Sequence, residues 1–321
     1  MVVNVGVIGA GSMGTALAQT VAPNSKVKLY ARREEIANDI NCNGVNSQYF
    51  PNVKLHENIS AITDYNDLHD AEIIFLCTPS SVMRNVVTEL KQCVNEDCIF
   101  VNTAKGIENG TNKRMTEVIG EITGRDAVAF SGPNIASEMV KNFPASTTIA
   151  CNNEDYLNKV KSVLSTDTFK VSVLDDVIGT EFCGIIKNVI AISQGICEGM
   201  EINYNAKFTI FTKSFIEAKD IIERLGGNRS TVDNFCGFGD IVTASMLSVS
   251  RNQTLGVLSG KGIIVDEKAS GVLFEGKNTV IILKEICNKL GYESLTVNFV
   301  HDVIIDNENP KIAFFKFWDS L

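Results

Sequence analysis

The sequence has little of the material from which metal sites and disulfide frameworks are built. Only three histidines occur in 321 residues, and none has the spacing of metal ligands, so we expect no metal site. The nine cysteines include no CxxC pair and are odd in number, which argues against a disulfide framework. Some, such as Cys77, lie within apolar runs. Reduced thiols of this kind predict a cytoplasmic protein.

Long apolar runs and excess positive charge are also missing. No stretch of 18 apolar residues exists, so no transmembrane helix is expected. Residues 2–8 lack the basic region and cleavage site of a signal peptide, and we interpret them as a first strand. The net charge of −9 argues against nucleic acid as a partner. An acidic protein that binds an anionic small molecule must gather its few cations at the binding site.

Length and hydrophobic patterning predict two domains. The first half alternates helical segments with β-rich runs at residues 2–8, 27–30, 72–77, 98–102, 127–131, 146–150 and 169–173. Apolar strands separated by helices are typical of a doubly wound, mostly parallel sheet. After about residue 175 only helices are expected, over residues 181–196, 204–225 and 280–290. We therefore predict an α/β chain with an N-terminal Rossmann-type domain at 1–176 and an all-α substrate domain at 177–321.

The motif Gly9-Ala10-Gly11-Ser12-Met13-Gly14 lies between the first expected strand and a helix. In such a loop the first glycine makes a tight turn, the second lets the backbone approach a pyrophosphate, and the third allows close packing of helix on strand. The N–H groups that begin the helix then face the phosphates. A glycine-rich turn without a ligand is the alternative, but the position directly after a strand favours a dinucleotide site.

The end of the second expected strand bears on which cofactor binds. An enzyme that prefers NAD usually has an acid there to contact the ribose hydroxyl. This chain instead continues from Tyr30 through Ala31 to Arg32 and Arg33, whose guanidinium groups suit a 2′-phosphate. A solvated loop edge beside Glu34 is the alternative. NADP(H) is the predicted cofactor, with NAD(H) as the second possibility.

One face of the helix expected over residues 181–196 carries a lysine among small residues. Opposite the apolar residues lie Gly184, Lys187, Asn188, Ala191 and Gly195, which share a face at helical spacing. Small residues let another segment approach the backbone, and Lys187 would project into that contact. Partial burial would suit its amine to acid–base chemistry. A lysine that reaches solvent at the helix edge is the alternative.

Three further segments carry candidate polar groups. Residues 103–107 include Lys105 and follow a strand end, at the edge where α/β sheets bind ligands. Residues 237–243 place Asp240 after two glycines at an expected helix start, with an ordinary N-cap as the alternative. Residues 248–252 offer donors for a phosphate, with a surface arginine as the alternative.

With these motifs in their order, the chain resembles the bacterial-type NAD(P)-dependent glycerol-3-phosphate dehydrogenases along almost its whole length. The matching segments are residues 9–18, 103–107, 132–138, 179–199, 205–217, 237–243, 250–252 and 274–276. The resemblance implies a homodimer that transfers a hydride between NAD(P)(H) and the pair of sn-glycerol 3-phosphate and dihydroxyacetone phosphate. It also implies the reducing direction, which supplies a precursor of glycerophospholipids.

The resemblance implies a role for each matching residue. Lys187 would give a proton to the carbonyl oxygen of dihydroxyacetone phosphate, while Asp240 and Asn188 orient the lysine and the substrate. Lys105 would lie between nicotinamide and substrate. The substrate would also contact Gly132, Asn134, Ser250, Arg251 and Asn252. The cofactor would contact Gly9, Gly11, Ser12, Met13, Gly14, Arg32, Arg33, Lys105, Ala136, Arg251, Leu273 and Glu275.

Three positions depart from the family pattern. The family usually has Ser or Thr in place of Asn134, Thr in place of Ala244 and glycine in place of Ser214. These departures put the identity of the substrate in question, and two alternatives stand beside the dihydroxyacetone phosphate reaction. One is a sister dehydrogenase that acts on another small phosphorylated ketone or alcohol. The other is a non-catalytic NADP(H)-sensing protein, which would have no reason to keep Lys187 and Asp240 together.

Overall fold

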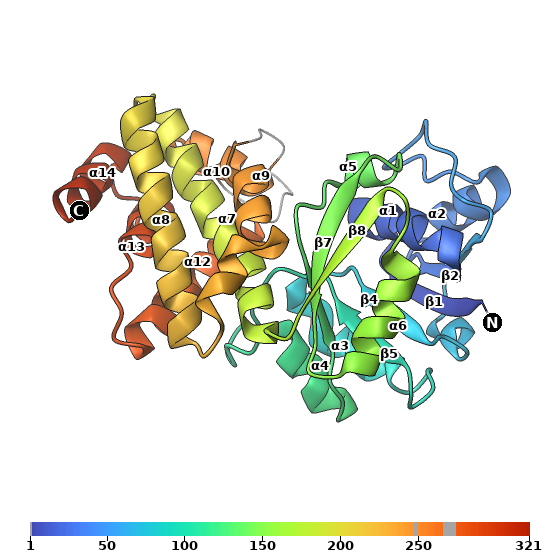
Figure 1. Cartoon of the computed structure of the whole chain (residues 1–321). Coiled ribbons are helices and arrows are strands. Elements are labelled where there is room, and N and C mark those ends of the chain that lie inside the picture. The colour runs from blue at the N-terminus through green and yellow to red at the C-terminus, as the bar shows by residue number, and fades with distance from the viewer. Residues whose placement is uncertain (1, 247–249, 266–273) are drawn as a thin grey trace. The chain divides into compact units, whose positions relative to one another are not determined.

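The chain folds as two compact units, Met1–Val177 and Ile178–Leu321, which we call unit 1 and unit 2 (Figure 1). The sequence places this boundary after residue 176. The computed structural model describes residues 2–246, 250–265 and 274–321. Among the helices so described, none is long and apolar enough to cross a membrane.

Unit 1 contains one 8-stranded sheet in the order β3-β2-β1-β4-β5-β6-β7-β8. All neighbouring strands are parallel except β6 and β7, which are antiparallel. The doubly wound sheet predicted from the sequence is confirmed. The strands are β1 (Val3–Ile8), β2 (Ser25–Tyr30), β3 (Ile59–Ile62), β4 (Ile73–Leu76), β5 (Ile99–Asn102), β6 (Val128–Ser131), β7 (Ala145–Ala150) and β8 (Phe169–Leu174).

The edge strand β3 was not among the predicted runs. It has four residues, Ile59-Ser60-Ala61-Ile62, and only the first and third are buried. Strand β3 pairs with β2 alone. So short an alternating segment carries too little hydrophobic signal to be separated from a loop by sequence alone.

Helices cover both faces of the sheet, as Figure 1 shows. Alternate side chains of β4 enter two cores, because successive strand residues point to opposite faces. Ile73 and Phe75 pack in the core that contains Leu17, whereas Ile74 and Leu76 pack in the core that contains Met83. The helices of unit 1 are α1 (Ser12–Val21), α2 (Glu34–Asn38), α3 (Met83–Leu90), α4 (Met115–Thr123), α5 (Ala136–Met139) and α6 (Glu154–Leu164).

The described part of unit 2 is helical and has no strand, as predicted. Its longest helices correspond to the expected apolar periodicities, and α8 ends as expected before Gly226, whose φ of 86° is left-handed. The helices are α7 (Val177–Gly199), α8 (Tyr204–Arg224), α9 (Asp240–Met246), α10 (Arg251–Gly260), α12 (Glu275–Lys289), α13 (Leu295–Ile304) and α14 (Pro310–Asp319).

Helices α7 and α10 are in backbone contact along a row of glycines. A Cβ atom on Gly195 would lie 2.2 Å from the carbonyl oxygen of Gln253, far closer than van der Waals contact allows. Gly199, Gly256 and Gly260 have similarly short approaches to the facing helix. The small-residue face predicted for α7 is therefore occupied by α10 along its second half.

Candidate active site

The glycine loop of unit 1 has the geometry expected of a phosphate-binding turn. Gly9 follows β1 with a φ of 108°, in the left-handed region that favours glycine. A Cβ on Gly14 would lie 1.8 Å from the carbonyl oxygen of Gly9, so only glycine allows α1 to pack here. A Cβ on Gly11 would meet nothing within 4 Å, and no side chain caps α1 there. Open space therefore lies beside the start of α1, where a pyrophosphate would fit.

Asn46 contacts this loop from elsewhere in the chain, and sequence reasoning missed it. It is buried, and its Nδ2 donates to the carbonyl oxygen of Ala10 at 3.1 Å and to Oγ1 of Thr15 at 2.8 Å. It therefore holds the glycine loop from a segment 36 positions further along the chain. Sequence alone does not reveal this contact, because an asparagine next to glycine, as in Asn43-Gly44, usually indicates only a turn.

Arg32 and Arg33 follow β2 at its carboxyl end, and both are exposed. Arg33 donates a hydrogen bond to Oε1 of Gln48. No acidic residue lies between Tyr30 and the start of α2 at Glu34. Both exposed guanidinium groups thus lie at the strand end where the sequence predicts the adenosine ribose.

Lys105 connects the loops that follow β5 and β6. Its Nζ donates to the carbonyl oxygen of Gly132 at 3.2 Å. Asn134 is tied to β7, because its Nδ2 donates to the carbonyl oxygen of Ser146 at 3.0 Å and its Oδ1 accepts from Thr147 at 3.2 Å. The amide nitrogen and the amide oxygen of Asn134 therefore each make a hydrogen bond within unit 1. Ala136, the first residue of α5, is half-buried nearby in the chain.

Lys187 and Asp240 form a buried ion pair in unit 2. Nζ of Lys187 donates to Oδ1 of Asp240 at 2.8 Å, and the two side chains are 15% and 3% exposed. The ammonium group of Lys187 therefore contacts the carboxylate of Asp240 instead of extending into solvent. Asn188, the next residue of α7, is also buried.

Asp240 is the first residue of α9 and follows a π-helical segment, Phe235–Gly239. A Cβ on Gly237 would lie 2.1 Å from the carbonyl oxygen of Val232, so this turn requires glycine. Ala244, one turn after the acid, is buried. The predicted position of the acid at a helix start is confirmed, and its side chain reaches across to α7.

The segment after α9 contains the candidate phosphate residues. Ser250 is the N-cap of α10, and its Oγ accepts from the N–H of Gln253. Arg251, the first residue of the helix, is exposed. Oδ1 of Asn252 accepts from the N–H of Gly276 at 3.2 Å, which brings it beside Glu275 at the start of α12. Leu273, predicted to contact cofactor, lies outside the described residues.

Of the departures from the family pattern, Ser214 has a structural role. It is buried in α8, its hydroxyl donates to the carbonyl oxygen of Ile210 at 2.8 Å, and Thr296 of α13 donates to it at 2.9 Å. The substitution of a serine for glycine here connects two helices of unit 2.

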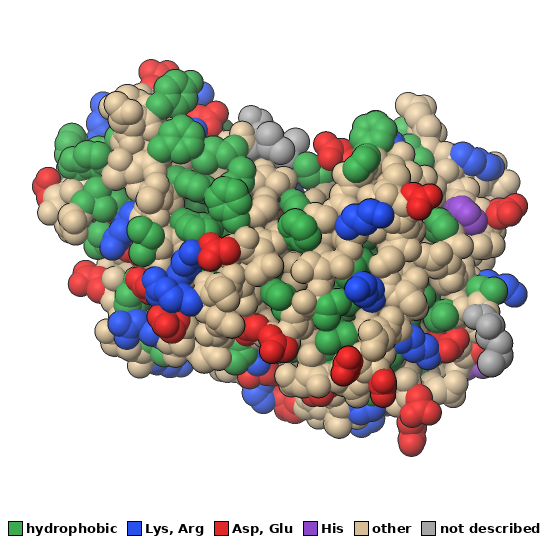
Figure 2. Space-filling view, viewed as in Figure 1, with side chains coloured by type: hydrophobic (Ala, Val, Ile, Leu, Met, Phe, Trp, Pro, Cys, Tyr) green, Lys and Arg blue, Asp and Glu red, His purple; other side chains and the backbone are tan. Residues whose placement is uncertain are grey.

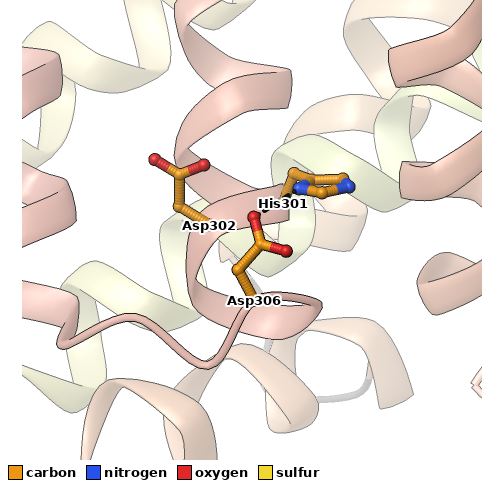
Figure 3. A group of neighbouring side chains, drawn as sticks. All are labelled: His301, Asp302 and Asp306. Atoms are coloured by element: carbon orange, nitrogen blue, oxygen red, sulfur yellow. Dashed lines mark hydrogen bonds and ion pairs between the residues drawn. The ribbon is translucent and has the colours of Figure 1, made fainter.

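Within the described residues, one group of three side chains could hold a metal ion. These side chains are His301, Asp302 and Asp306 (Figure 3). Nδ1 of His301 lies 3.0 Å from Oδ2 of Asp306, and burial raises the pKa of Asp302. Nζ of Lys316 lies 3.9 Å from Oδ2 of Asp302. A protein cation therefore already lies beside this group.

Comparison with known proteins identifies the family. The model described as NAD-dependent glycerol-3-phosphate dehydrogenase N-terminus matches residues 4–157, and the C-terminus model matches residues 176–314. A glycerol-3-phosphate dehydrogenase [NAD(P)+] from Corynebacterium urealyticum is 34% identical over 317 residues, with 96% of each chain covered. The enzyme of the same description from Methanothermobacter thermautotrophicus is 34% identical, with 98% of this chain and 97% of that one covered.

Solved structures agree with this result. The crystal structure of glycerol-3-phosphate dehydrogenase from Coxiella burnetii has a TM-score of 0.90 and 28% identity, with 98% of each chain covered. A ketopantoate reductase from Ralstonia eutropha, with 13% identity and a TM-score of 0.62, shares only the fold. The chain therefore belongs to the NAD-dependent glycerol-3-phosphate dehydrogenase family.

Proposed function

We propose that this protein interconverts sn-glycerol 3-phosphate and dihydroxyacetone phosphate. The observation that carries the proposal is the buried Lys187–Asp240 pair in a chain of this family. A bound nicotinamide cofactor supplies or accepts the hydride at the central carbon. Lys187 gives its proton to the carbonyl oxygen in reduction and takes one from the alcohol in oxidation.

The carboxylate of Asp240 supports both directions of this proton transfer. It lies 2.8 Å from Nζ of Lys187, which is close enough to orient the amine that gives or takes the proton. Asn188 lies beside the lysine on α7 and offers an amide to the substrate.

The remaining cations serve the anionic groups of substrate and cofactor. Arg251 and Asn252 at the start of α10, together with Ser250, would hold the substrate phosphate. In unit 1, the glycine loop would hold the pyrophosphate and Lys105 would lie beside the nicotinamide. Gathering these cations locally overcomes a net charge of −9.

The test follows absorbance of the reduced nicotinamide when dihydroxyacetone phosphate is added to the protein with NADPH or NADH. Turnover with this substrate and slow turnover with unphosphorylated dihydroxyacetone support the proposal. Faster turnover of a different phosphorylated ketone would indicate the sister dehydrogenase. Cofactor binding without turnover of any member of the panel would indicate the sensor.

The relatives are described as enzymes of NAD(P)+, and we propose that NADP(H) is preferred here. The support is the exposed pair Arg32 and Arg33 at the end of β2, with no acid at the strand tip. Guanidinium groups in this position suit the 2′-phosphate of NADP(H). The measurement that tests this preference is the ratio of the dissociation constants of NADPH and NADH.

We also propose a cytoplasmic homodimer. All nine cysteines are free, and most are buried, which suits a reducing compartment. Figure 2 shows hydrophobic side chains gathered over the helical unit. Helix α8 itself carries exposed apolar residues, namely Tyr204, Phe208 and Ile216, at 78%, 49% and 44% exposure. Exposed apolar groups of this size favour a protein interface. Sedimentation equilibrium gives the oligomeric state directly.

A further inference from the structure

A cavity of about 300 Å³ lies in unit 2, near the ends of α10 and α13. Helix α13 packs against α10, α12 and α14, and all four helices contribute residues to the walls. The chain turns away from α10 at Gly262 and from α13 at Asn307, with left-handed φ values of 77° and 55°, and both residues line the space. Its volume is that of a small-molecule site. None of the residues assigned above to substrate or cofactor lines it.

One lysine of this cavity carries a charge that no other described residue matches. Lys277, in the first turn of α12, is partly buried, and its Nζ has neither a hydrogen bond nor an ion pair with the described residues. Glu308 also lines the cavity, but both of its carboxylate oxygens accept from Nζ of Lys316, at 2.7 and 2.8 Å. The charge of Glu308 is therefore matched within the chain. A partly buried cation without a counter-charge favours the approach of an anion.

The same cavity has aliphatic walls. Leu255 of α10 and Val303 and Ile304 of α13 line it and are buried. Ile263 and Ile264 also line it, yet they are 49% and 77% exposed, so two large aliphatic side chains contact water here. A bound aliphatic chain would cover this surface, and removing apolar surface from water is favourable. The cavity thus combines an unmatched cation with apolar groups.

We propose that this cavity binds a small amphipathic monoanion, namely a carboxylate that carries an aliphatic chain. Lys277 would hold the carboxylate by a charge-assisted hydrogen bond, and the chain would pack on Ile263 and Leu255. One unmatched lysine balances one negative charge, which favours a monocarboxylate over a dicarboxylate or a phosphate ester. The site is separate from the proposed phosphate residue, because Ser259 of its lining follows Arg251 by eight residues on α10, about 12 Å along the axis.

Isothermal titration calorimetry of the full-length protein tests the proposal, with hexanoate, octanoate and decanoate as probes below the concentrations at which they form micelles. Kd should fall roughly fourfold for each added methylene group until the chain fills the cavity, because each methylene group leaves water. Octanol, which keeps the chain and lacks the charge, should bind at least roughly tenfold more weakly than octanoate. Saturating sn-glycerol 3-phosphate should leave the Kd of octanoate unchanged.

Variants separate the charge from the volume. Lys277→Met, which removes the charge and keeps an unbranched side chain, should weaken octanoate binding at least roughly tenfold. Lys277→Glu should abolish octanoate binding and bind octylamine instead, because the sign of the charge is reversed. Ser259→Leu narrows the cavity and should weaken the binding of decanoate more than that of hexanoate.

Lys289→Met is the matched control for the loss of charge. Lys289 lies on the same helix, is exposed and does not line the cavity. Its substitution should leave the Kd of octanoate unchanged, and an equal loss in this variant would mean that the net charge of the protein governs binding.

Three further results would overturn the inference. The first is a wild-type protein that binds none of the carboxylates. The second is an unchanged Kd in Lys277→Met that unfolds at the wild-type temperature. The third is displacement of octanoate by sn-glycerol 3-phosphate, which would place the anion in the proposed active site. Octanoate binding to a protein without dehydrogenase activity would contradict the proposed function and support this cavity as a site of its own.

Discussion

We expect Lys187→Met to lower kcat by about 10²–10⁴-fold while leaving cofactor affinity nearly intact, because proton transfer is lost and the cofactor residues of unit 1 are untouched. A loss of 10³ corresponds to about 4 kcal/mol of transition-state stabilisation. The assay is steady-state turnover at saturating dihydroxyacetone phosphate, with cofactor affinity measured by fluorescence titration. Retention of more than a tenth of the wild-type kcat would refute the role of Lys187.

The buried environment of the pair adds a second effect that must be separated from the first. Removing Lys187 leaves the Asp240 carboxylate, which is 3% exposed, without its cation. Breaking a buried ion pair in this way costs about 3–5 kcal/mol, a large part of the roughly 5–15 kcal/mol by which a domain is stable. The thermal midpoint of Lys187→Met should therefore fall. The double variant Lys187→Met/Asp240→Asn should regain stability without regaining activity, because its buried amide is neutral.

The chain offers a matched control for the stability effect alone. Lys213 on α8 has its Nζ 3.7 Å from the carboxylate of Glu217, which is 2% exposed and takes no part in the proposed chemistry. Lys213→Met should lower the thermal midpoint and leave kcat per folded molecule within roughly threefold. If this variant lost as much kcat as Lys187→Met, the loss in both would reflect destabilisation, and the catalytic interpretation would fail.

Three further outcomes are expected. Arg251→Ala should raise KM for dihydroxyacetone phosphate by roughly one to two decades with a smaller change in cofactor affinity, because a charge-assisted phosphate contact contributes ~1.5–3 kcal/mol. If the wild-type protein reduced unphosphorylated dihydroxyacetone equally well, this phosphate contact would be contradicted. The double change Arg32→Ala/Arg33→Ala should weaken NADPH binding and spare NADH in parallel titrations, and equal losses would exclude these arginines from 2′-phosphate recognition. Burial raises the pKa of the Cys98 thiol to about 12, so at pH 8 it is protonated and unreactive. Iodoacetamide followed by peptide mass spectrometry should therefore label the exposed Cys42 first, and early labelling of Cys98 would contradict its burial.

The fold was predictable where hydrophobic periodicity is strong. The buried strands β1 and β4 and the long helices α7 and α8 each repeat their pattern over several residues, so sequence alone places them. The edge strand β3 has four residues and one neighbour, and its existence depends on pairing with β2, which is a tertiary effect.

The site was predictable residue by residue only where a motif has a local physical reason. The glycine loop is such a case, because its turn and its packing are decided within six residues. Periodicity left Lys187 undecided between a buried and a solvent-reaching group, since its partner Asp240 lies 53 positions away. The same limit explains why sequence alone reveals neither the contact of Asn46 with the glycine loop nor the hydrogen bonds of Asn134 to β7.

The contact between α7 and α10 has a consequence for the kind of molecule that can react. The proposed proton donor Lys187 belongs to α7, and Arg251, proposed to hold the substrate phosphate, begins α10. Because Gly195 and Gly256 bring the two backbones together without intervening side chains, neither helix can shift along the other unless the backbones first separate. The spacing between the points where these two side chains leave their helices is thus set by main-chain atoms. We therefore expect substitutions elsewhere around the site to change this spacing little, so that the proposed reaction would favour substrates of one separation between carbonyl and phosphate.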